Sequence, residues 1–196
     1  MNRVDRTRAA AEDLRRAGGR DAQVEIVEYD PAWPTRFAAE LERIGPLLGG
    51  VEIHHFGSTA VPGLAAKPVI DMIALVDNLD THIAALTTGG GYEFPRAFNA
   101  TLAHRRFLCY PGAAVRTYHL HLVDEPGELE RRLRFRDLLR SDAALAREYV
   151  TLKRALAVRH RDNREAYTQA KAEFIRASLA SDGELGKSGY GGVSST

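Results

Sequence analysis

A chain of 196 residues, 44% of them hydrophobic and 27% charged, is long enough to form one domain with a substantial core. Its formal net charge of +1 gives no global reason to bind nucleic acid or a membrane surface, so neither partner is expected. A single cysteine, Cys109, excludes an internal disulfide, and no apolar run is long enough to span a bilayer. The N-terminal stretch is charged and lacks an apolar signal core, so we expect a cytoplasmic protein.

The predicted elements begin after a polar N-terminal extension at 1–22 and form a single domain at 23–181. Period-two alternation and apolar runs predict strands or extended pieces at 24–29, 51–56, 68–76, 92–96, 103–110 and 115–123. Apolar stripes at helical spacing predict helices at 33–48, 78–88, 144–159 and 164–179, with another opening at Glu128. The Gly/Ser-rich stretch 182–196 lacks core residues and is expected to be a disordered tail. The order predicts an α/β (α+β) fold, a mixed sheet backed by helices, with a helical C-terminal extension.

The segment between the strands at 51–56 and 68–76 carries the first candidate site. Gly57, Ser58 and Thr59 follow an apolar strand, and their N–H groups and hydroxyls suit a phosphate. Asp71 stands early in the next apolar strand, where a charge needs a partner, and Mg²⁺ prefers such carboxylates. The alternatives are an ordinary turn at Gly57 and a structural Asp71 paired with an arginine.

The second candidate site is the sequence His119-Leu120-His121. Alternation along a strand puts both imidazoles on one face, where they could share a metal, flank a phosphate or act as a base. If this strand lies beside that of Asp71, the three side chains would form one metal or acid–base cluster. Imidazole ligands would favour zinc, manganese or iron over magnesium. The alternative is a pair of solvated histidines.

Basic residues around these strands are candidate phosphate contacts. Lys67 stands at the entry to the Asp71 strand, and three arginines lie on the extended pieces near the histidines: Arg105, Arg106 and Arg116. A guanidinium suits bidentate phosphate binding, although at least one of the three is expected to be a rim charge. His55 either points into the same cleft or is a hydrogen-bonded residue at the strand end. Arg134 and Arg136 fit a solvated, ion-paired helix face.

Six segments between Val24 and Leu179 resemble the GrpB family, a divergent branch of the DNA polymerase beta-type nucleotidyltransferase superfamily. They are 29–33, 55–64, 67–71, 118–123, 135–140 and 149–153. The resemblance implies a nucleotidyltransferase-like mixed sheet whose Gly-Ser turn and carboxylates hold two Mg²⁺ ions around a nucleoside triphosphate. Gly57, Ser58 and Asp71 match this pattern. The second carboxylate position is Ile73, and His119 and His121 stand where the third carboxylate is expected, so two-magnesium chemistry is in question.

Three functions are therefore open. The first is transfer of a nucleotidyl or phosphoryl group from a nucleoside triphosphate to an unknown small acceptor. In it, Asp71, His119 and His121 bind a divalent metal (Mg or Mn, with Zn as an alternative) and carry catalysis; Gly57, Ser58, Thr59, Lys67 and Arg116 hold the nucleotide. The second is a non-catalytic nucleotide- or coenzyme A-binding accessory module, since GrpB-like domains also occur fused behind dephospho-CoA kinase. The third is a metal-dependent hydrolase built on Asp71 and the two histidines. The sequence does not predict the oligomeric state.

Overall fold

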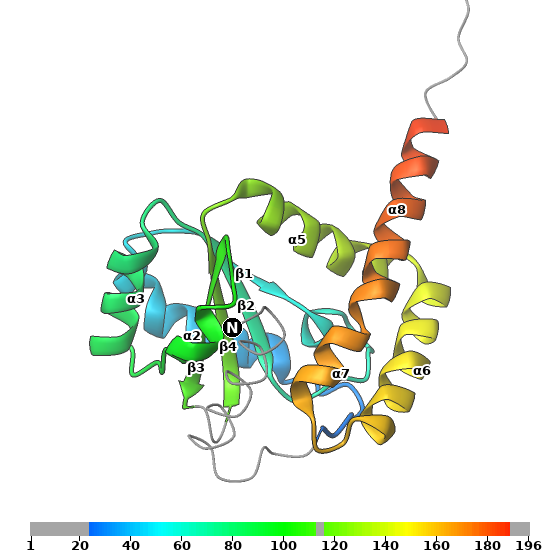
Figure 1. Ribbon diagram of the computed structural model, residues 1–196, viewed down its shortest axis with the longest axis horizontal. Coiled ribbons are helices and arrows are strands. Elements are labelled where there is room, and N and C mark those ends of the chain that lie inside the picture. The colour runs from blue at the N-terminus through cyan, green and yellow to red at the C-terminus, as the bar shows by residue number, and fades with distance from the viewer. Residues whose placement is uncertain (1–23, 113–115, 189–196) are drawn as a thin grey trace, which may run out of the picture.

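The computed structural model describes residues 24–112 and 116–188, and its centre is a four-stranded mixed sheet (Figure 1). The strand order is β1-β2-β4-β3. The strands are β1 (Ile53–Phe56), β2 (Ile70–Leu75), β3 (Arg105–Pro111) and β4 (Arg116–Val123). The central pair β2 and β4 is parallel, and the two outer pairs are antiparallel. Two strands distant in the sequence therefore lie side by side at the middle of the sheet.

The helices surround this sheet in two groups. They are α2 (Trp33–Ile44), α3 (Leu79–Thr88), α4 (Arg96–Asn99), α5 (Pro126–Ser141), α6 (Ala143–Arg159), α7 (Arg164–Ala170) and α8 (Ala172–Ser188), with short 3₁₀ turns at Gly45–Leu48 and Ser58–Ala60. Asn78 caps α3: its side-chain oxygen accepts a hydrogen bond from the backbone N–H of Thr81 at 3.0 Å. None of the helices within the described ranges is long and apolar enough to cross a membrane.

One face of the sheet is covered by α2 and α3 and forms the main core. Alternate residues of the strands, such as Met72, Leu108 and Leu120, are fully buried there. They pack against Trp33 and Leu86, which come from α2 and α3. The apolar face of this sheet is therefore buried in the hydrophobic core against α2 and α3.

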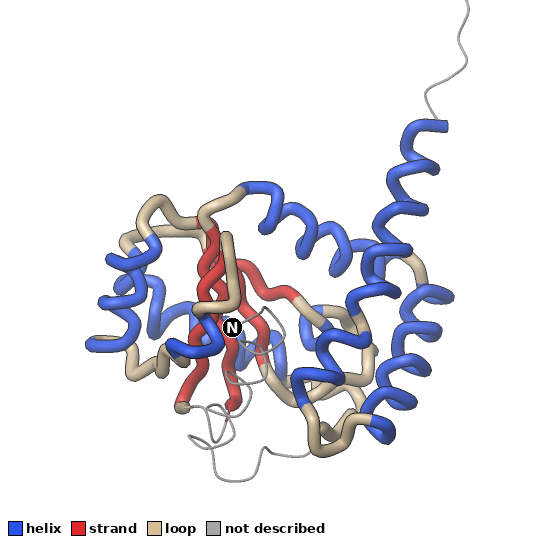
Figure 2. Tube along the Cα trace, in the orientation of Figure 1, coloured by secondary structure: helices blue, strands red, loops and turns tan. Residues whose placement is uncertain are grey.

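The opposite face carries the polar residues, and the C-terminal helices α5 to α8 lie on that side (Figures 1 and 2). Leu129 and Leu133 of α5 pack on Phe56, Ile73 and Val123 at one end of the face. The remaining part of the face holds Asp71 and the two histidines, so α5 packs beside the candidate site.

The predicted mixed sheet backed by helices, with a helical C-terminal part, is confirmed. The predicted strand at 24–29 is wrong: these residues form only one isolated bridge, between Val27 and Ala66. The N–H of Val24 instead donates a hydrogen bond to the carbonyl of Arg161. The segment thus pairs with two different parts of the chain at its two ends and does not form a strand of the sheet. The piece at 92–96 is likewise reduced to a bridge between Glu93 and Cys109.

The C-terminal helices also differ from their predicted limits. The helix expected at 164–179 is divided at Lys171 into α7 and α8, and α8 continues to Ser188. The expected tail starts at residue 182, whereas α8 runs six residues further, to Ser188. Asp182 forms an ion pair with Arg134 of α5 at 2.6 Å, which holds this part of α8 against the domain. The predicted extension at 1–22 and the rest of the tail, 189–196, lie outside the described residues.

Candidate metal centre

The parallel pairing of β2 and β4 places Asp71 directly beside His119. The Nδ1 atom of His119 lies 2.9 Å from Oδ1 of Asp71. The Asp71 side chain keeps 30% of its surface exposed, whereas that of His119 keeps 11%. The partner of Asp71 is thus an imidazole rather than the arginine of the alternative interpretation, and its carboxylate remains accessible to solvent.

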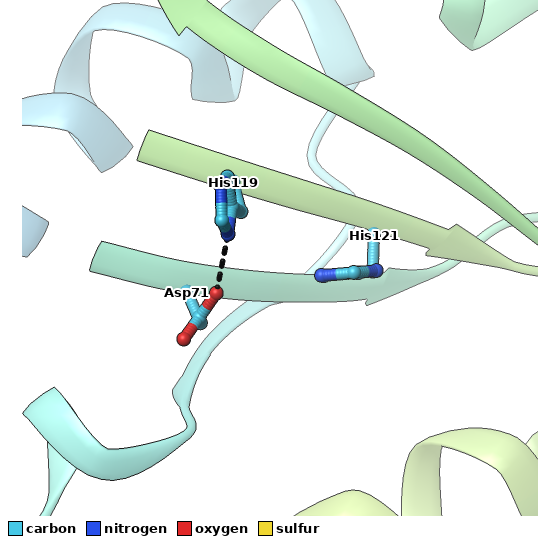
Figure 3. A group of neighbouring side chains, drawn as sticks. All are labelled: Asp71, His119 and His121. Atoms are coloured by element: carbon cyan, nitrogen blue, oxygen red, sulfur yellow. Dashed lines mark hydrogen bonds and ion pairs between the residues drawn. The ribbon is translucent and has the colours of Figure 1, made fainter. Parts of the chain in front are cut away.

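His121 completes the group two residues further along β4, on the same face as His119 (Figure 3). Its ring makes edge contacts with Phe56 and is also close to Phe107, whose ring centroid lies 5.4 Å away. Arg105 reaches the same ring, with its Nη1 atom 3.3 Å from Nδ1 of His121. The predicted convergence of the two histidines on Asp71 is confirmed, although their chemical role stays a prediction.

The three side chains have the spacing of a metal site. One ligand atom from each of Asp71, His119 and His121 lies within 4.8 Å of the others. Metal–ligand bonds of about 2.1 Å place neighbouring ligand atoms about 3.0 to 3.4 Å apart, depending on geometry. The atoms Oδ1 of Asp71 and Nδ1 of His119 are 2.9 Å apart, close to this separation, although a metal ion bound by both would replace their hydrogen bond. His121 needs a shift of about 1.4 to 1.8 Å. The residues therefore fit one divalent ion.

The charge states at neutral pH suit the same ion. Burial lowers the pKa of His119 to about 4, against the opposing effect of Asp71, and burial holds the pKa of His121 well below its usual value. Burial alone would raise the pKa of Asp71, but the hydrogen bond from His119 and nearby positive charges keep that pKa lowered. The cluster offers two neutral imidazoles and one carboxylate, which are the protonation states that metal ligands require.

The Gly-Ser turn lies against the open side of Asp71. Gly57 has φ 73° and ψ −169°, a conformation that side-chain-bearing residues avoid. A Cβ atom placed at this position would lie 2.7 Å from Oδ2 of Asp71. The hydroxyl of the next residue, Ser58, accepts a hydrogen bond of 3.1 Å from Nζ of Lys153. The turn, the carboxylate and a buried lysine are thus neighbours.

Thr59 and His55 have structural roles on the other side of the turn. The Thr59 hydroxyl donates to the carbonyl of Val69 at 3.2 Å and lies 3.0 Å from Nε2 of His55. The His55 ring stacks on Phe37 at 4.8 Å, so His55 is the hydrogen-bonded strand-end residue of the two alternatives and does not enter the cluster. Thr59 is buried, which leaves its predicted contact with a nucleotide without geometric support.

Lys67 and Arg116 act on the centre through their charge. Both lower the pKa of His119, though less than burial does, and Lys67 also lowers that of Asp71. The register of β4 is irregular at its start, where Pro111 pairs with Arg116 and Tyr110 with Tyr118, so alternation does not fix the direction of Arg116 and its contact with a nucleotide stays a prediction. Arg106 is a rim charge, since its guanidinium donates to the carbonyl groups of Leu102 and Ala103.

Sequence reasoning missed several basic residues of α5 and α6. Arg136, which the sequence placed on a solvated helix face, donates a hydrogen bond to the backbone carbonyl of His55. Arg140, which the sequence did not single out, donates to the carbonyl of Ala60, so both arginines hold the ends of the Gly-Ser loop. Lys153 is 1% exposed, and burial lowers its pKa to about 7. Its position four residues after the buried Tyr149, on one helix stripe, was the signal that would have revealed it.

The second carboxylate position is occupied by an apolar side chain in a fully packed place. Ile73 lies on the same face as Asp71 and is 0% exposed, in contact with Phe56 and Val123. No acidic side chain in the described part of the chain joins Asp71 in the cluster. The arrangement fits one metal ion with nitrogen-rich ligands and does not fit the two-magnesium site of the nucleotidyltransferases.

The fold and this site define a mixed α/β protein with a candidate metal centre between its sheet and its C-terminal helices. The model of the GrpB protein family matches residues 23–181, so the chain belongs to the GrpB family. It is 41% identical over 162 residues to UPF0157 protein PA4798 of Pseudomonas aeruginosa, covering 79% of this chain and 66% of that protein. It is 36% identical over 159 residues to UPF0157 protein YqkA of Bacillus subtilis, covering 79% of this chain and 46% of that one. The chain thus spans less than two thirds of the length of each.

A solved structure confirms the fold. The crystal structure of the conserved protein GrpB from Enterococcus faecalis superimposes with a TM-score of 0.70 at 35% identity, covering 80% of this chain and 96% of that chain. A cytoplasmic RNA terminal U-transferase matches with a TM-score of only 0.35 at 12% identity, covering 77% of this chain and 46% of that chain.

Proposed function

We propose that this GrpB protein binds one divalent metal ion with Asp71, His119 and His121 and uses it to transfer a phosphate-containing group from a nucleotide to a small acceptor. The observation that carries the proposal is the convergence of these three side chains within 4.8 Å, with the two histidines buried and Asp71 partly exposed. The donor set of two imidazoles and one carboxylate favours manganese, zinc or iron over magnesium. An ion held there would supply positive charge to a phosphoryl oxygen.

The residues around the cluster support a phosphorylated substrate. Gly57 brings the backbone within contact distance of the Asp71 carboxylate, and the Ser58 hydroxyl stands next in the chain. Lys67 and Lys171 place positive charge near Asp71, whose pKa both of them lower. A substrate phosphate bound between the turn and these lysines would be oriented toward the metal ligands, and positioning of this kind is a large part of phosphoryl-transfer catalysis.

A second function is favoured by the packing of Ile73. Because this side chain is fully buried, the carboxylate that normally completes a nucleotidyltransferase site is missing. A protein that keeps the cluster and the Gly-Ser turn but lacks the chemistry would bind a nucleotide or coenzyme A as an accessory module. It would be stabilised by the ligand without turning it over. Hydrolysis remains the variant of the first function in which water is the acceptor.

Metal binding is the first test, and Asp71→Asn is the informative variant because asparagine keeps the shape while removing the charge. Asp77→Asn is its matched control, since Asp77 follows the same strand and its side chain is 93% exposed. We expect about one equivalent of Mn²⁺ or Zn²⁺ in the wild type and the control. Loss of a direct ligand should weaken metal binding more than about 100-fold, the upper range for second-shell changes. Equal metal affinity in all three proteins would refute the metal centre.

Turnover separates the two functions. Release of phosphate or pyrophosphate from ATP is measured with and without Mn²⁺, and binding of ATP and coenzyme A is followed by thermal denaturation. Metal-dependent release that is lost in Asp71→Asn and kept in Asp77→Asn supports transfer or hydrolysis. Stabilisation by either ligand without release, across all nucleoside triphosphates, supports the accessory module and refutes the catalytic proposal.

A further inference from the structure

Two arginines from different elements meet beside His121, on the side of the cluster away from the Gly-Ser turn. Arg105 begins β3 and places its guanidinium 3.3 Å from the His121 ring nitrogen. Arg132 comes from α5 and lies 6.0 Å from the centroid of Phe56, whose ring in turn contacts His121. The two guanidinium groups are close enough that Arg132 has the largest electrostatic effect on Arg105 of any charged group.

The positive charge in this corner exceeds the negative charge. Arg131 and Arg132 share a single carboxylate, that of Glu128. Among the side chains that the structure describes, Arg105 has no carboxylate at ion-pair distance. Three guanidinium groups therefore face Glu128 and the more distant Asp71, which also acts on Arg105 and Arg132, and the corner keeps a net charge of +1. The Nε atom of Arg132 is also buried without a hydrogen-bond partner among the described residues. Burying unpaired cationic donors is costly, which points to an anion as the natural occupant.

The contact between Arg105 and His121 has a consequence for metal binding. A guanidinium can only donate hydrogen bonds, so Nδ1 of His121 is the acceptor and the proton of the neutral ring is on Nε2. A metal bond through Nδ1 would take the lone pair that Arg105 now uses. A bond through Nε2 would require the proton on Nδ1, where it would face an N–H of Arg105. Metal coordination by His121 therefore excludes this hydrogen bond.

We propose that Arg105 and Arg132 form a binding site for a substrate phosphate group, and that metal coordination by His121 releases Arg105 to occupy it. The inference rests on the proposed metal centre and names the anion site that serves it. Guanidinium forks match the tetrahedral oxygens of a phosphate. With a divalent ion bound, three guanidinium groups and two carboxylates leave about +3, which a phosphate monoester dianion balances better than a carboxylate does. Metal and phosphate then bind cooperatively. Metal binding frees Arg105 to bind phosphate, and by linkage phosphate binding strengthens metal binding by the same factor.

Calorimetric titrations of the full chain with Mn²⁺ and with phenyl phosphate test this coupling. Benzoate is the matched carboxylate ligand. The variants are Arg105→Met and Arg132→Met, which keep most of the side-chain stem, and Arg105→Lys, which keeps the charge but loses the fork. Arg134→Met is the control, since it removes the same charge from α5 at a residue that pairs with Asp182 instead. Thermal denaturation verifies that each variant is folded.

In the wild type, Mn²⁺ should tighten phenyl phosphate binding by about fivefold or more, the lower range of allosteric coupling. Both methionine variants should weaken phenyl phosphate binding by about tenfold or more, the range for truncated charged hydrogen bonds, and Arg105→Lys should fall between. Arg105→Met alone should bind Mn²⁺ more tightly than the wild type, because the competing hydrogen bond is gone. Arg134→Met should leave both affinities unchanged.

Three results would overturn the inference: wild-type phosphate affinity in both methionine variants, benzoate binding as tight as phenyl phosphate binding, or Mn²⁺ affinity that is unchanged or weaker in Arg105→Met. Failure of the metal centre is distinguishable from these. If the wild type binds no Mn²⁺, the proposed function and the release of Arg105 both fail. The arginine site is then judged on metal-free titrations, where loss of phosphate binding in both variants supports it and retention refutes it.

Discussion

Replacing Gly57 with alanine measures how closely the Gly-Ser turn is built against Asp71. The new Cβ atom would lie 2.7 Å from Oδ2, about 0.7 Å short of the 3.4 Å at which ordinary contact begins. The backbone at φ 73° and ψ −169° adds strain of about 1–3 kcal/mol for a residue with a side chain. Moving the carboxylate would also weaken its charge-assisted hydrogen bond with His119, a bond of about 1.5–3 kcal/mol.

We therefore expect Gly57→Ala to lower the free energy of unfolding by about 3 kcal/mol, which corresponds to about 6–12 °C in Tm for a chain of this size. Gly63→Ala is the matched control in the same loop, since Gly63 has φ 74° but nothing within 4 Å of the new Cβ. Its cost should be backbone strain alone, about 1–2 kcal/mol. Urea denaturation gives both values, and Mn²⁺ titration should show weakened binding only in Gly57→Ala. Equal destabilisation and equal metal affinity in the two variants would refute the contact.

Two further predictions concern pH. The folded pKa of Lys153, about 7, lies below the unfolded value of 10.5, so the unfolded state binds more protons between these limits. The free energy of unfolding of the wild type minus that of Lys153→Met should rise between about pH 7 and 10.5 and be constant below pH 7. Urea denaturation measures this difference, and a value that does not change with pH would contradict the lowered pKa. Burial likewise lowers the pKa of His55 to about 4 from 6.5, so stability from this group is lost as pH falls from about 6.5 to 4. His55→Phe, which keeps the stacking on Phe37, should show a smaller loss of urea midpoint between pH 6.5 and 4.5 than the wild type, and an identical loss would show that His55 does not titrate in this range.

Alternation and turn chemistry were enough to predict part of the site. The apolar neighbours of Asp71 indicated a buried strand, and the His119-Leu120-His121 alternation put both imidazoles on one face. The same local rules failed at 24–29, where alternation is present but no neighbouring strand offers a ladder. Local pattern reports which way a side chain faces, and it does not report what lies beside it.

The contacts of Lys153 and Arg105 were beyond sequence reasoning for the same reason. Lys153 reaches a hydroxyl 95 positions earlier in the chain, and Arg105 meets Arg132 only because α5 crosses the end of the sheet. Each contact depends on the relative placement of two elements. That placement is set by the packing of many side chains together, and it cannot be read from the hydrophobic periodicity of a single segment.

By itself, the sequence determined the identities and faces of the candidate ligands, the glycine that permits the turn, and the absence of a second carboxylate at Ile73. Only the tertiary structure decided that β2 and β4 are adjacent and parallel, and this pairing brings Asp71 to 2.9 Å from His119. The physical reason is that strand order is a long-range property. β3 and β4 pair locally through a short connection, but β4 lies beside β2 because that position buries Met72 and Leu120 in one common core.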